Sequence, residues 1–138
     1  MTMITPVLAL VIWTLIVWCW MYALRIPAMQ KAKINPDDAI HPGSLSSLPS
    51  DVRVAADNYN HLHEQPTIFY ALAIYSYLVG VGDALNMWLA WGYVAARVVH
   101  SLIQIVLKKV LLRFMVFAAG SVILMIIAAR NLFALLLA

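Results

Sequence analysis

The chain has 138 residues, of which 64% are hydrophobic and only 11% are charged, and its mean hydropathy is +0.89. Soluble domains carry about 25% charged residues, so this composition excludes a water-covered globular surface and predicts an all-α integral membrane protein. The formal net charge is +3, but the basic residues stand in short clusters beside apolar runs, as in membrane proteins, which argues against a nucleic-acid partner.

The first apolar run covers residues 6–24 and contains no charge. A membrane-spanning helix needs about 20 apolar residues, so this run predicts the first span. It lacks the basic stretch that opens a secretory signal peptide, so we interpret it as a retained span. Pro27 predicts the end of this helix, and the polar, proline-rich residues 25–50 predict one long cytoplasmic loop.

Three further spans are predicted along the rest of the chain. A second helix begins near Asp51 and becomes apolar enough for a span over residues 62–81. A glycine-containing turn separates it from the third span, residues 84–107, and a short basic turn precedes the fourth, residues 114–137. The sequence therefore predicts a single membrane domain, residues 1–138, folded as a bundle of four transmembrane helices.

Basic residues gather in two of the three connections between these spans. They are Arg25, Lys31, Lys33 and Arg53 in the first connection, and Lys108, Lys109 and Arg113 in the third. The middle connection holds none. Since cytoplasmic loops carry an excess of lysine and arginine, we expect the long loop and the basic turn in the cytoplasm and both termini outside.

Two series of polar residues recur at helical spacing on the two inner helices. On the second helix they are Arg53, Asp57, Asn60 and Glu64, and on the third they are Tyr93, Arg97, His100, Gln104 and Lys108. Steps of three and four residues place each series on one helical face. At about 1.5 Å per residue, Glu64 and Arg97 each lie roughly 15 Å from the cytoplasmic end of their helix.

A charge inside a bilayer costs at least about 2.5–3.5 kcal/mol, so we predict that Glu64 and Arg97 form an ion pair inside the bundle. One interpretation is that such a pair only fixes the register of the two helices. The region also carries further polar side chains, namely Asn60, His63, His100 and Gln104. These favour a wet cleft that opens to the cytoplasm, where the basic residues suit an anionic ligand.

A proline and two histidines near this cleft also allow alternative interpretations. Pro66 frees a main-chain carbonyl near Leu62, either as a kink that the membrane tolerates or as one that opens the cleft. His61 and His63 point to different faces of a helix, so no metal site is predicted.

The segment NHLHEQP at residues 60–66, followed by TIFY, and the segment ARVVH at 96–100, with Gln104 one turn later, resemble the MAPEG family of membrane-associated proteins in eicosanoid and glutathione metabolism. The order of spans is also similar, over nearly the whole chain. The resemblance implies a homotrimer of four-helix protomers that binds glutathione between protomers near the cytoplasmic side.

The resemblance also implies roles for particular residues. The expected glutathione-binding residues are Asn60, Glu64, Arg97, His100, Gln104, Arg53 and His63. Arg113 or Lys109 is expected to stabilise the thiolate, because nearby positive charge lowers the pKa of a thiol.

The second-helix motif departs from the usual glutathione-binding pattern of the family, Arg-x-x-x-Asn-x-x-Glu-x-x-Pro. Ala56 stands where the arginine is expected, and Glu64 follows Asn60 by four positions, so that His63 occupies the expected glutamate position. The pattern is more similar to that of bacterial members, which implies a bacterial inner (plasma) membrane.

Two functions follow as hypotheses. The first is a glutathione-dependent transferase or peroxidase that acts on lipophilic electrophiles arriving from the membrane lipids. The second is a non-catalytic membrane protein that binds a lipid or another small anion, or serves as a partner subunit. A transporter is disfavoured, because no paired halves with broken spans are seen.

Overall fold

The computed structural model describes the backbone of residues 1–138 and every side chain except that of Pro42. The elements, in chain order, are α1 (Ile4–Lys31), the 3₁₀ turns η1 (Pro36–Asp38) and η2 (Pro42–Leu45), α2 (Ser50–His61), α3 (Pro66–Leu78), α4 (Ala84–Leu102), the π-helical segment η3 (Ile103–Leu107) and α5 (Val110–Leu136). The described residues are thus helices joined by turns, as the composition predicts.

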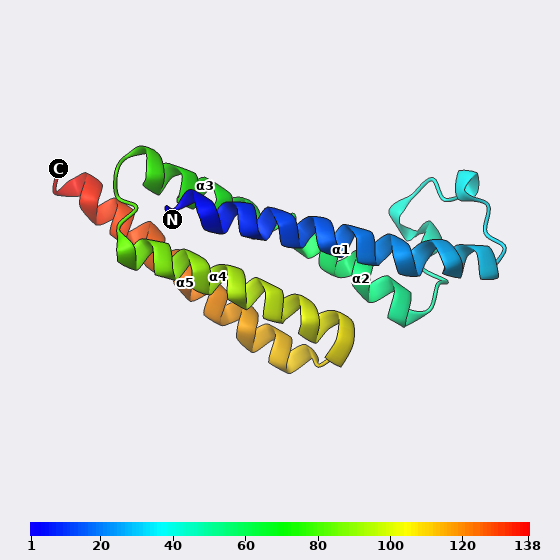
Figure 1. Cartoon of the computed structure of the whole chain (residues 1–138). Helices are drawn as coiled ribbons and strands as arrows, with labels where there is room; N and C mark the ends of the chain where they lie inside the picture. Colours follow the sequence, from blue (N-terminus) through cyan, green and yellow to red (C-terminus); the bar gives the residue numbers. More distant parts are fainter.

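The helices pack side by side along one long axis (Figure 1). α1 runs beside α2 and α3, while α4 and α5 form an antiparallel pair that packs against them. Both termini lie at the end that carries the turn between α3 and α4, and residues 32–49 lie at the opposite end. Three helical stretches are long and apolar enough to cross a membrane: Ile4–Lys31, Ala84–Leu107 and Val110–Leu136.

α1 continues past Pro27, so the prediction that this proline ends the helix is wrong. A proline inside a helix loses one hydrogen bond and crowds the carbonyl one turn before it. The residues after Pro27 include alanine, methionine, glutamine and lysine, which are good helix formers, and α1 packs on α2. The predicted loop over residues 25–50 is therefore shortened to residues 32–49, because its first part is helical.

The second predicted span is built from two helices instead of one. α2 ends at His61 and α3 begins at Pro66, with turns over residues 62–65. Pro66 occupies the first position of α3, where its missing N–H needs no partner and its fixed φ suits the helix. Residues 62–65 therefore form turns instead of a regular helix.

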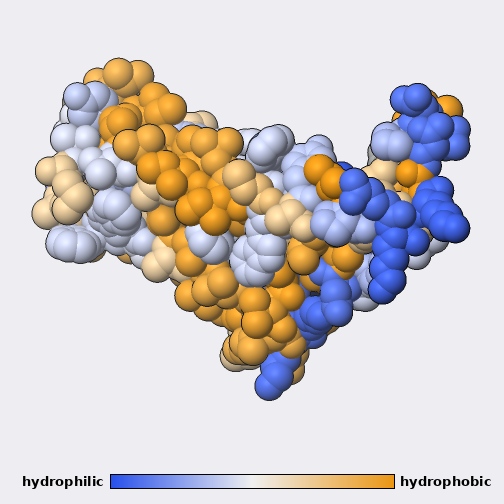
Figure 2. All heavy atoms as spheres, turned by 45° about the vertical axis from the view of Figure 1, so that its right-hand side comes forward, coloured by the Kyte–Doolittle hydropathy of each residue, from blue (hydrophilic) through white to orange (hydrophobic). Residues whose placement is uncertain are grey.

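The outer surface of the helices is largely apolar. Figure 2 shows orange hydrophobic residues over the body of the molecule and blue hydrophilic residues toward the end that carries residues 32–49. α5 in particular exposes large apolar side chains along its length, among them Leu111, Phe114, Met125 and Phe133. This is the distribution expected of helices that face lipid or a neighbouring subunit.

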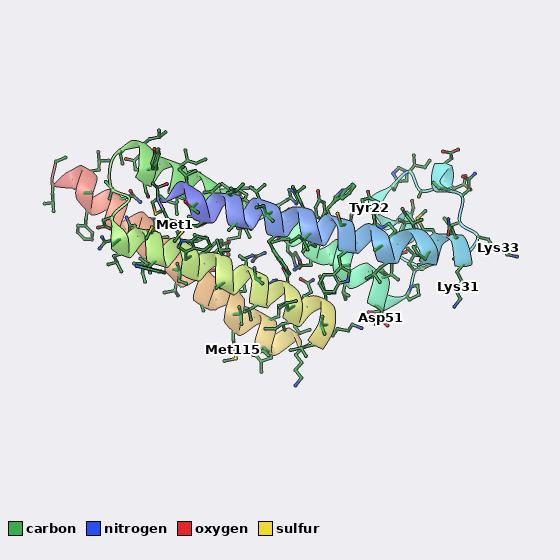
Figure 3. All side chains as sticks on the ribbon, viewed as in Figure 1. Met1, Tyr22, Lys31, Lys33, Asp51 and Met115 are labelled. Atoms are coloured by element: carbon green, nitrogen blue, oxygen red, sulfur yellow. The ribbon has the colours of Figure 1, made fainter. Side chains whose placement is uncertain are left out.

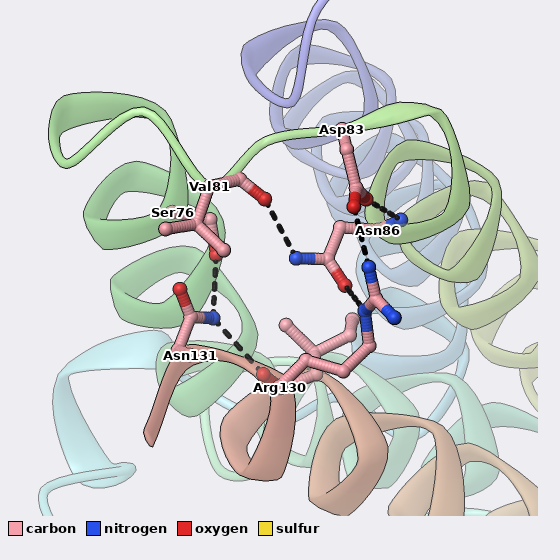
Figure 4. A network of polar contacts seen from close by, with 7 residues as sticks. Ser76, Val81, Asp83, Asn86, Arg130 and Asn131 are labelled. Carbon is pink, nitrogen blue, oxygen red and sulfur yellow. Dashed lines mark hydrogen bonds and ion pairs between the residues drawn. The ribbon is translucent and has the colours of Figure 1, made fainter. Parts of the chain in front are cut away.

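A polar network joins α4 and α5 near the termini (Figure 4). The buried Asn86 side chain donates to the Val81 carbonyl oxygen at 2.8 Å and accepts from Arg130 Nε at 2.7 Å. Arg130 also forms an ion pair with Asp83, whose side chain caps the N-terminus of α4. Arg130 is thus held by partners at the N-terminal end of α4.

Replacing Asn86 with Leu is expected to lower the free energy of unfolding by about 1–3 kcal/mol, because the Val81 carbonyl and Arg130 Nε each lose a partner. The measurement is equilibrium unfolding in detergent micelles. A matched apolar change at an exposed position of the same helix, Val99→Leu, is expected to stay within about 0.5 kcal/mol. Equal effects of the two changes would contradict a stabilising role for this network.

Candidate functional site

A pocket of about 290 Å³ lies where the turns over residues 62–65 meet α4 and the beginning of α5. We call it the central pocket; its lining residues are His61, Glu64, Gln65, Arg97, His100, Val110, Arg113, Phe114 and Phe117. Glu64, Arg97, His100 and Arg113 were all predicted from the sequence as site residues. The pocket therefore collects charged and polar side chains from three separate elements of an otherwise apolar bundle.

Arg97 is the most deeply buried charged residue that lines this pocket, with 2% of its surface exposed. Its Nη2 donates a hydrogen bond to the His61 carbonyl oxygen at 3.1 Å. Because His61 is the last residue of α2, this carbonyl belongs to the end of the helix, where main-chain oxygens carry partial negative charge. It also accepts a turn hydrogen bond from the Glu64 N–H at 3.2 Å. Arg97 thus stabilises the end of α2.

The predicted Glu64–Arg97 ion pair does not form: among the described residues, no carboxylate lies within 4 Å of the Arg97 guanidinium. Glu64 lines the same pocket but is exposed. The helix break is the physical reason, because it presents the His61 carbonyl to Arg97 and leaves Glu64 exposed in the turn that follows. Glu64 and Arg97 line one pocket, but they do not pair directly.

This geometry predicts unequal effects of removing the two charges. Arg97→Leu is expected to lower the free energy of unfolding by about 1.5–3 kcal/mol, because it removes a charged donor from a partly buried carbonyl. Glu64→Gln is expected to change it by less than about 0.5 kcal/mol, since the residue is exposed and unpaired. Unfolding of both variants in the same detergent measures the difference, and a costly Glu64→Gln change would restore the predicted ion pair.

A hydrogen-bond cluster beside the central pocket contains residues that the sequence reasoning missed. Asn58 Nδ2 donates to Gln104 Oε1 at 2.9 Å, and His61 Nδ1 lies 3.1 Å from the same oxygen. Gln104 is in the π-helical segment η3, an irregularity often found at functional sites. The Nδ1 atom of His100 is buried without a hydrogen-bond partner in the described part of the chain.

Gln65 connects the helix break to both α4 and α5. Its Oε1 accepts from the Tyr93 hydroxyl at 3.1 Å, and its Nε2 donates to Ser121 Oγ at 2.7 Å. Gln65 also lines a second pocket, of about 260 Å³, between α3 and α5, which we call the apolar pocket; its other lining residues are Ile68, Leu72, Ser121, Leu124, Met125 and Ala128. The central and apolar pockets therefore adjoin at Gln65.

On its other side the central pocket adjoins a basic pocket of about 210 Å³, with Val110 and Arg113 lining both. The basic pocket is lined by Ser50, Val54, Gln104, Lys108, Lys109, Val110 and Arg113. Lys108 forms an ion pair with Asp51, which leaves Lys109 and Arg113 as the charges not paired with a described carboxylate. Positive charge therefore continues from the basic turn into the central pocket.

Four of the predicted glutathione-binding residues do not line the central pocket. Gln104 lines the basic pocket, and the other three lie elsewhere. Arg53 and Asn60 line a separate pocket together with Arg25 of α1, on a different face of α2. His63 is exposed, and its Nδ1 lies 2.9 Å from the Tyr59 carbonyl oxygen. Within one chain, the polar series predicted on the second helix is thus divided between two pockets.

Comparison with known proteins gives one match. The MAPEG family model matches residues 3–133, which is nearly the whole chain. No curated protein and no solved structure matches it.

Proposed function

This chain belongs to the MAPEG family, and on that premise we propose that it is a glutathione-dependent transferase or peroxidase acting on lipophilic electrophiles. The resemblance expected from the sequence is confirmed, and the chain is an integral membrane protein of this family. The observation that carries the proposal is the row of three adjoining pockets, which runs from basic through mixed to apolar. Such a row suits one charged and one lipophilic substrate.

The charges of the central and basic pockets fit glutathione, a tripeptide with two carboxylates, an ammonium group and a thiol. Arg97, Arg113 and Lys109 offer donors for carboxylates, and the exposed carboxylate of Glu64 offers an acceptor for the ammonium group. The buried atoms Arg97 Nε and His100 Nδ1 lack partners among the described residues, which leaves them available to a ligand. Buried polar atoms usually have hydrogen-bond partners, and a bound ligand would supply partners to these two.

Arg113 is the residue that we assign to thiolate stabilisation. It is half-buried and lines both the central and the basic pocket, whereas Lys109 is exposed and lines the basic pocket alone. A positive charge is more effective where it is less screened by water. When bound, glutathione would supply a nucleophilic thiolate, and the Arg113 guanidinium would favour that ionised form.

The apolar pocket is the proposed place for the lipophilic electrophile. Its lining is mostly aliphatic, and Gln65 and Ser121 provide the polar groups at its boundary with the central pocket. An electrophile held there would have its reactive end near Gln65 and its apolar part among the helices. Tyr93 holds Gln65 in place through the 3.1 Å hydrogen bond.

We also propose a homotrimer in a bacterial inner membrane, with both termini outside. The end that holds residues 32–49 and the basic turn carries seven of the nine lysines and arginines: Arg25, Lys31, Lys33, Arg53, Lys108, Lys109 and Arg113. This distribution supports a cytoplasmic position for that end. Native mass spectrometry tests the trimer, and cysteine labelling at the termini of intact cells tests the orientation.

Glutathione titration of the purified oligomer, followed by calorimetry and thermal shift, tests the function. We expect saturable binding, ultraviolet absorbance of a bound thiolate, and conjugation of a chloronitrobenzene-type acceptor in detergent. S-methylglutathione is the control, because it keeps the charges of glutathione but cannot form a thiolate. Absence of both binding and conjugation at saturating glutathione would instead favour the non-catalytic alternative.

A further inference from the structure

The pocket that contains Arg25 and Arg53 shares no lining residue with the central pocket. It has a volume of about 140 Å³ and lies between the C-terminal part of α1, the segment around η2 and one face of α2. A water molecule has a share of about 30 Å³ in the liquid, so the space suits a small polar group of a few heavy atoms. The proposed transferase mechanism makes no use of it.

Two arginines face this pocket without a carboxylate partner. The described ion pairs join Lys108 to Asp51 and Arg130 to Asp83, and neither includes Arg25 or Arg53. The Arg25 guanidinium carbon lies 5.7 Å from the centre of the Tyr22 ring, a cation–π distance that holds the side chain beside α1. Guanidinium groups in pairs are well suited to bind the oxygens of a phosphate.

The same pocket also contains acceptor groups, the Asp57 carboxylate and the Asn60 side chain. A simple phosphate would be repelled by Asp57. A phosphate joined by a short linker to an ammonium group satisfies both ends, because the arginines take the phosphate and Asp57 takes the ammonium. The charge pattern therefore selects a zwitterion with hydrogen-bonding ends.

The place of the pocket along α1 indicates where such a group comes from. Arg25 is the first charged side chain in the sequence, and Lys31 and Lys33 lie beyond it at the end of α1 (Figure 3). Trp18 and Tyr22, two turns and one turn before Arg25, form an edge-to-face pair, and such aromatic residues gather at the level of lipid headgroups. Ile26, next to Arg25, is half exposed, as is expected beside acyl chains.

We propose that this pocket binds the headgroup of a phosphatidylethanolamine molecule from the adjacent leaflet. The phosphate lies between Arg25 and Arg53, and the ammonium group lies at Asp57 and Asn60. The acyl chains extend along the exposed apolar side of α1. The bound lipid thereby joins α1 to α2 at the end of the bundle that carries residues 32–49.

The test uses the full-length protein, stripped of lipid in detergent, and thermal shift on titration with four additives. They are phosphatidylethanolamine, phosphatidylglycerol, phosphatidylcholine and free O-phosphoethanolamine. We expect phosphatidylethanolamine to give the largest rise in melting temperature and the free compound a much smaller one. Equal rises with all three lipids, or free O-phosphoethanolamine as effective as the lipid, would overturn the proposal.

Variants locate the site. Arg25→Gln and Arg53→Gln are each expected to weaken the response to phosphatidylethanolamine about tenfold, from the loss of charged hydrogen bonds, and Arg25→Lys less. Asp57→Asn is expected to remove the preference over phosphatidylglycerol. Lys31→Gln is the control, since it removes the same charge from an exposed position outside the pocket.

A second measurement detects the bound lipid directly, so that it also applies to variants that are less stable without lipid. Native mass spectrometry of the protein from nanodiscs is expected to show retained phosphatidylethanolamine that is lost in Arg25→Gln and kept in Lys31→Gln. Loss from both variants alike would overturn the assignment. So would glutathione binding that falls in Arg25→Gln while lipid retention stays unchanged, because the pocket would then belong to the thiol site.

Discussion

An Arg97→Gln variant is expected to bind glutathione about 10- to 100-fold more weakly than the unaltered protein. Glutamine keeps much of the side-chain length but loses the charge, and a hydrogen bond to a charged group contributes about 1.5–3 kcal/mol. Arg97 is 2% exposed and its Nε has no partner among the described residues, so a carboxylate of the ligand gains a donor that water does not reach. Isothermal calorimetry of the purified oligomer measures the change.

Arg53→Gln is the matched control for this prediction. It removes the same charge from α2, but Arg53 lines the separate pocket with Arg25, so its glutathione affinity is expected to stay within about twofold of the unaltered protein. Arg97→Lys keeps the charge and a donor for the His61 carbonyl. It therefore tests whether weaker glutathione binding comes from the lost charge or from a less stable protein. A fall in affinity with Arg53→Gln as large as with Arg97→Gln would contradict the assignment of glutathione to the central pocket.

Arg113→Gln is expected to raise the pKa of the bound thiol by about one unit, which corresponds to 1.36 kcal/mol between its two protonation states. The sign follows from the charge: the guanidinium favours the thiolate, so its removal favours the neutral thiol. Below both pKa values the thiolate fraction at a fixed pH then falls about tenfold. Above both values the two proteins have the same thiolate fraction.

The measurement is the ultraviolet absorbance of the bound thiolate across a pH series, with the conjugation rate as a second readout. The rise of both with pH is expected to move to higher pH in Arg113→Gln. Lys109→Gln removes an exposed charge that lines only the basic pocket, and salt and water screen such a charge, so its shift is expected to be smaller. A larger shift for Lys109→Gln would assign the thiolate role to Lys109.

The polar series on the third predicted span was a reliable guide to the central pocket within α4, where Arg97 and His100 line it, whereas Gln104 lies beyond α4 in η3 and lines the basic pocket. Arg97, His100 and Gln104 are all buried in the structure, and burial of polar groups in a membrane protein requires partners inside the bundle. A sequence read only for charged groups still misses those partners. Asn58, His61 and Gln65 also follow steps of three and four residues. Together they form a second polar series, in which Asn58 contacts Gln104 and Gln65 contacts Tyr93.

The amino-acid sequence by itself determined that the chain is an all-helical membrane protein, where its long apolar helices lie, and which end carries the basic residues. These properties depend only on composition and on the local spacing of apolar and charged residues along the chain. Only the tertiary structure decided that α1 continues through Pro27, that the helix breaks between His61 and Pro66, and that Arg97 contacts a main-chain carbonyl instead of Glu64. Those outcomes depend on which groups packing brings within hydrogen-bonding distance. Pro66 indicated a freed carbonyl near Leu62, but nothing in the order of side chains showed that Arg97 would reach the neighbouring carbonyl of His61.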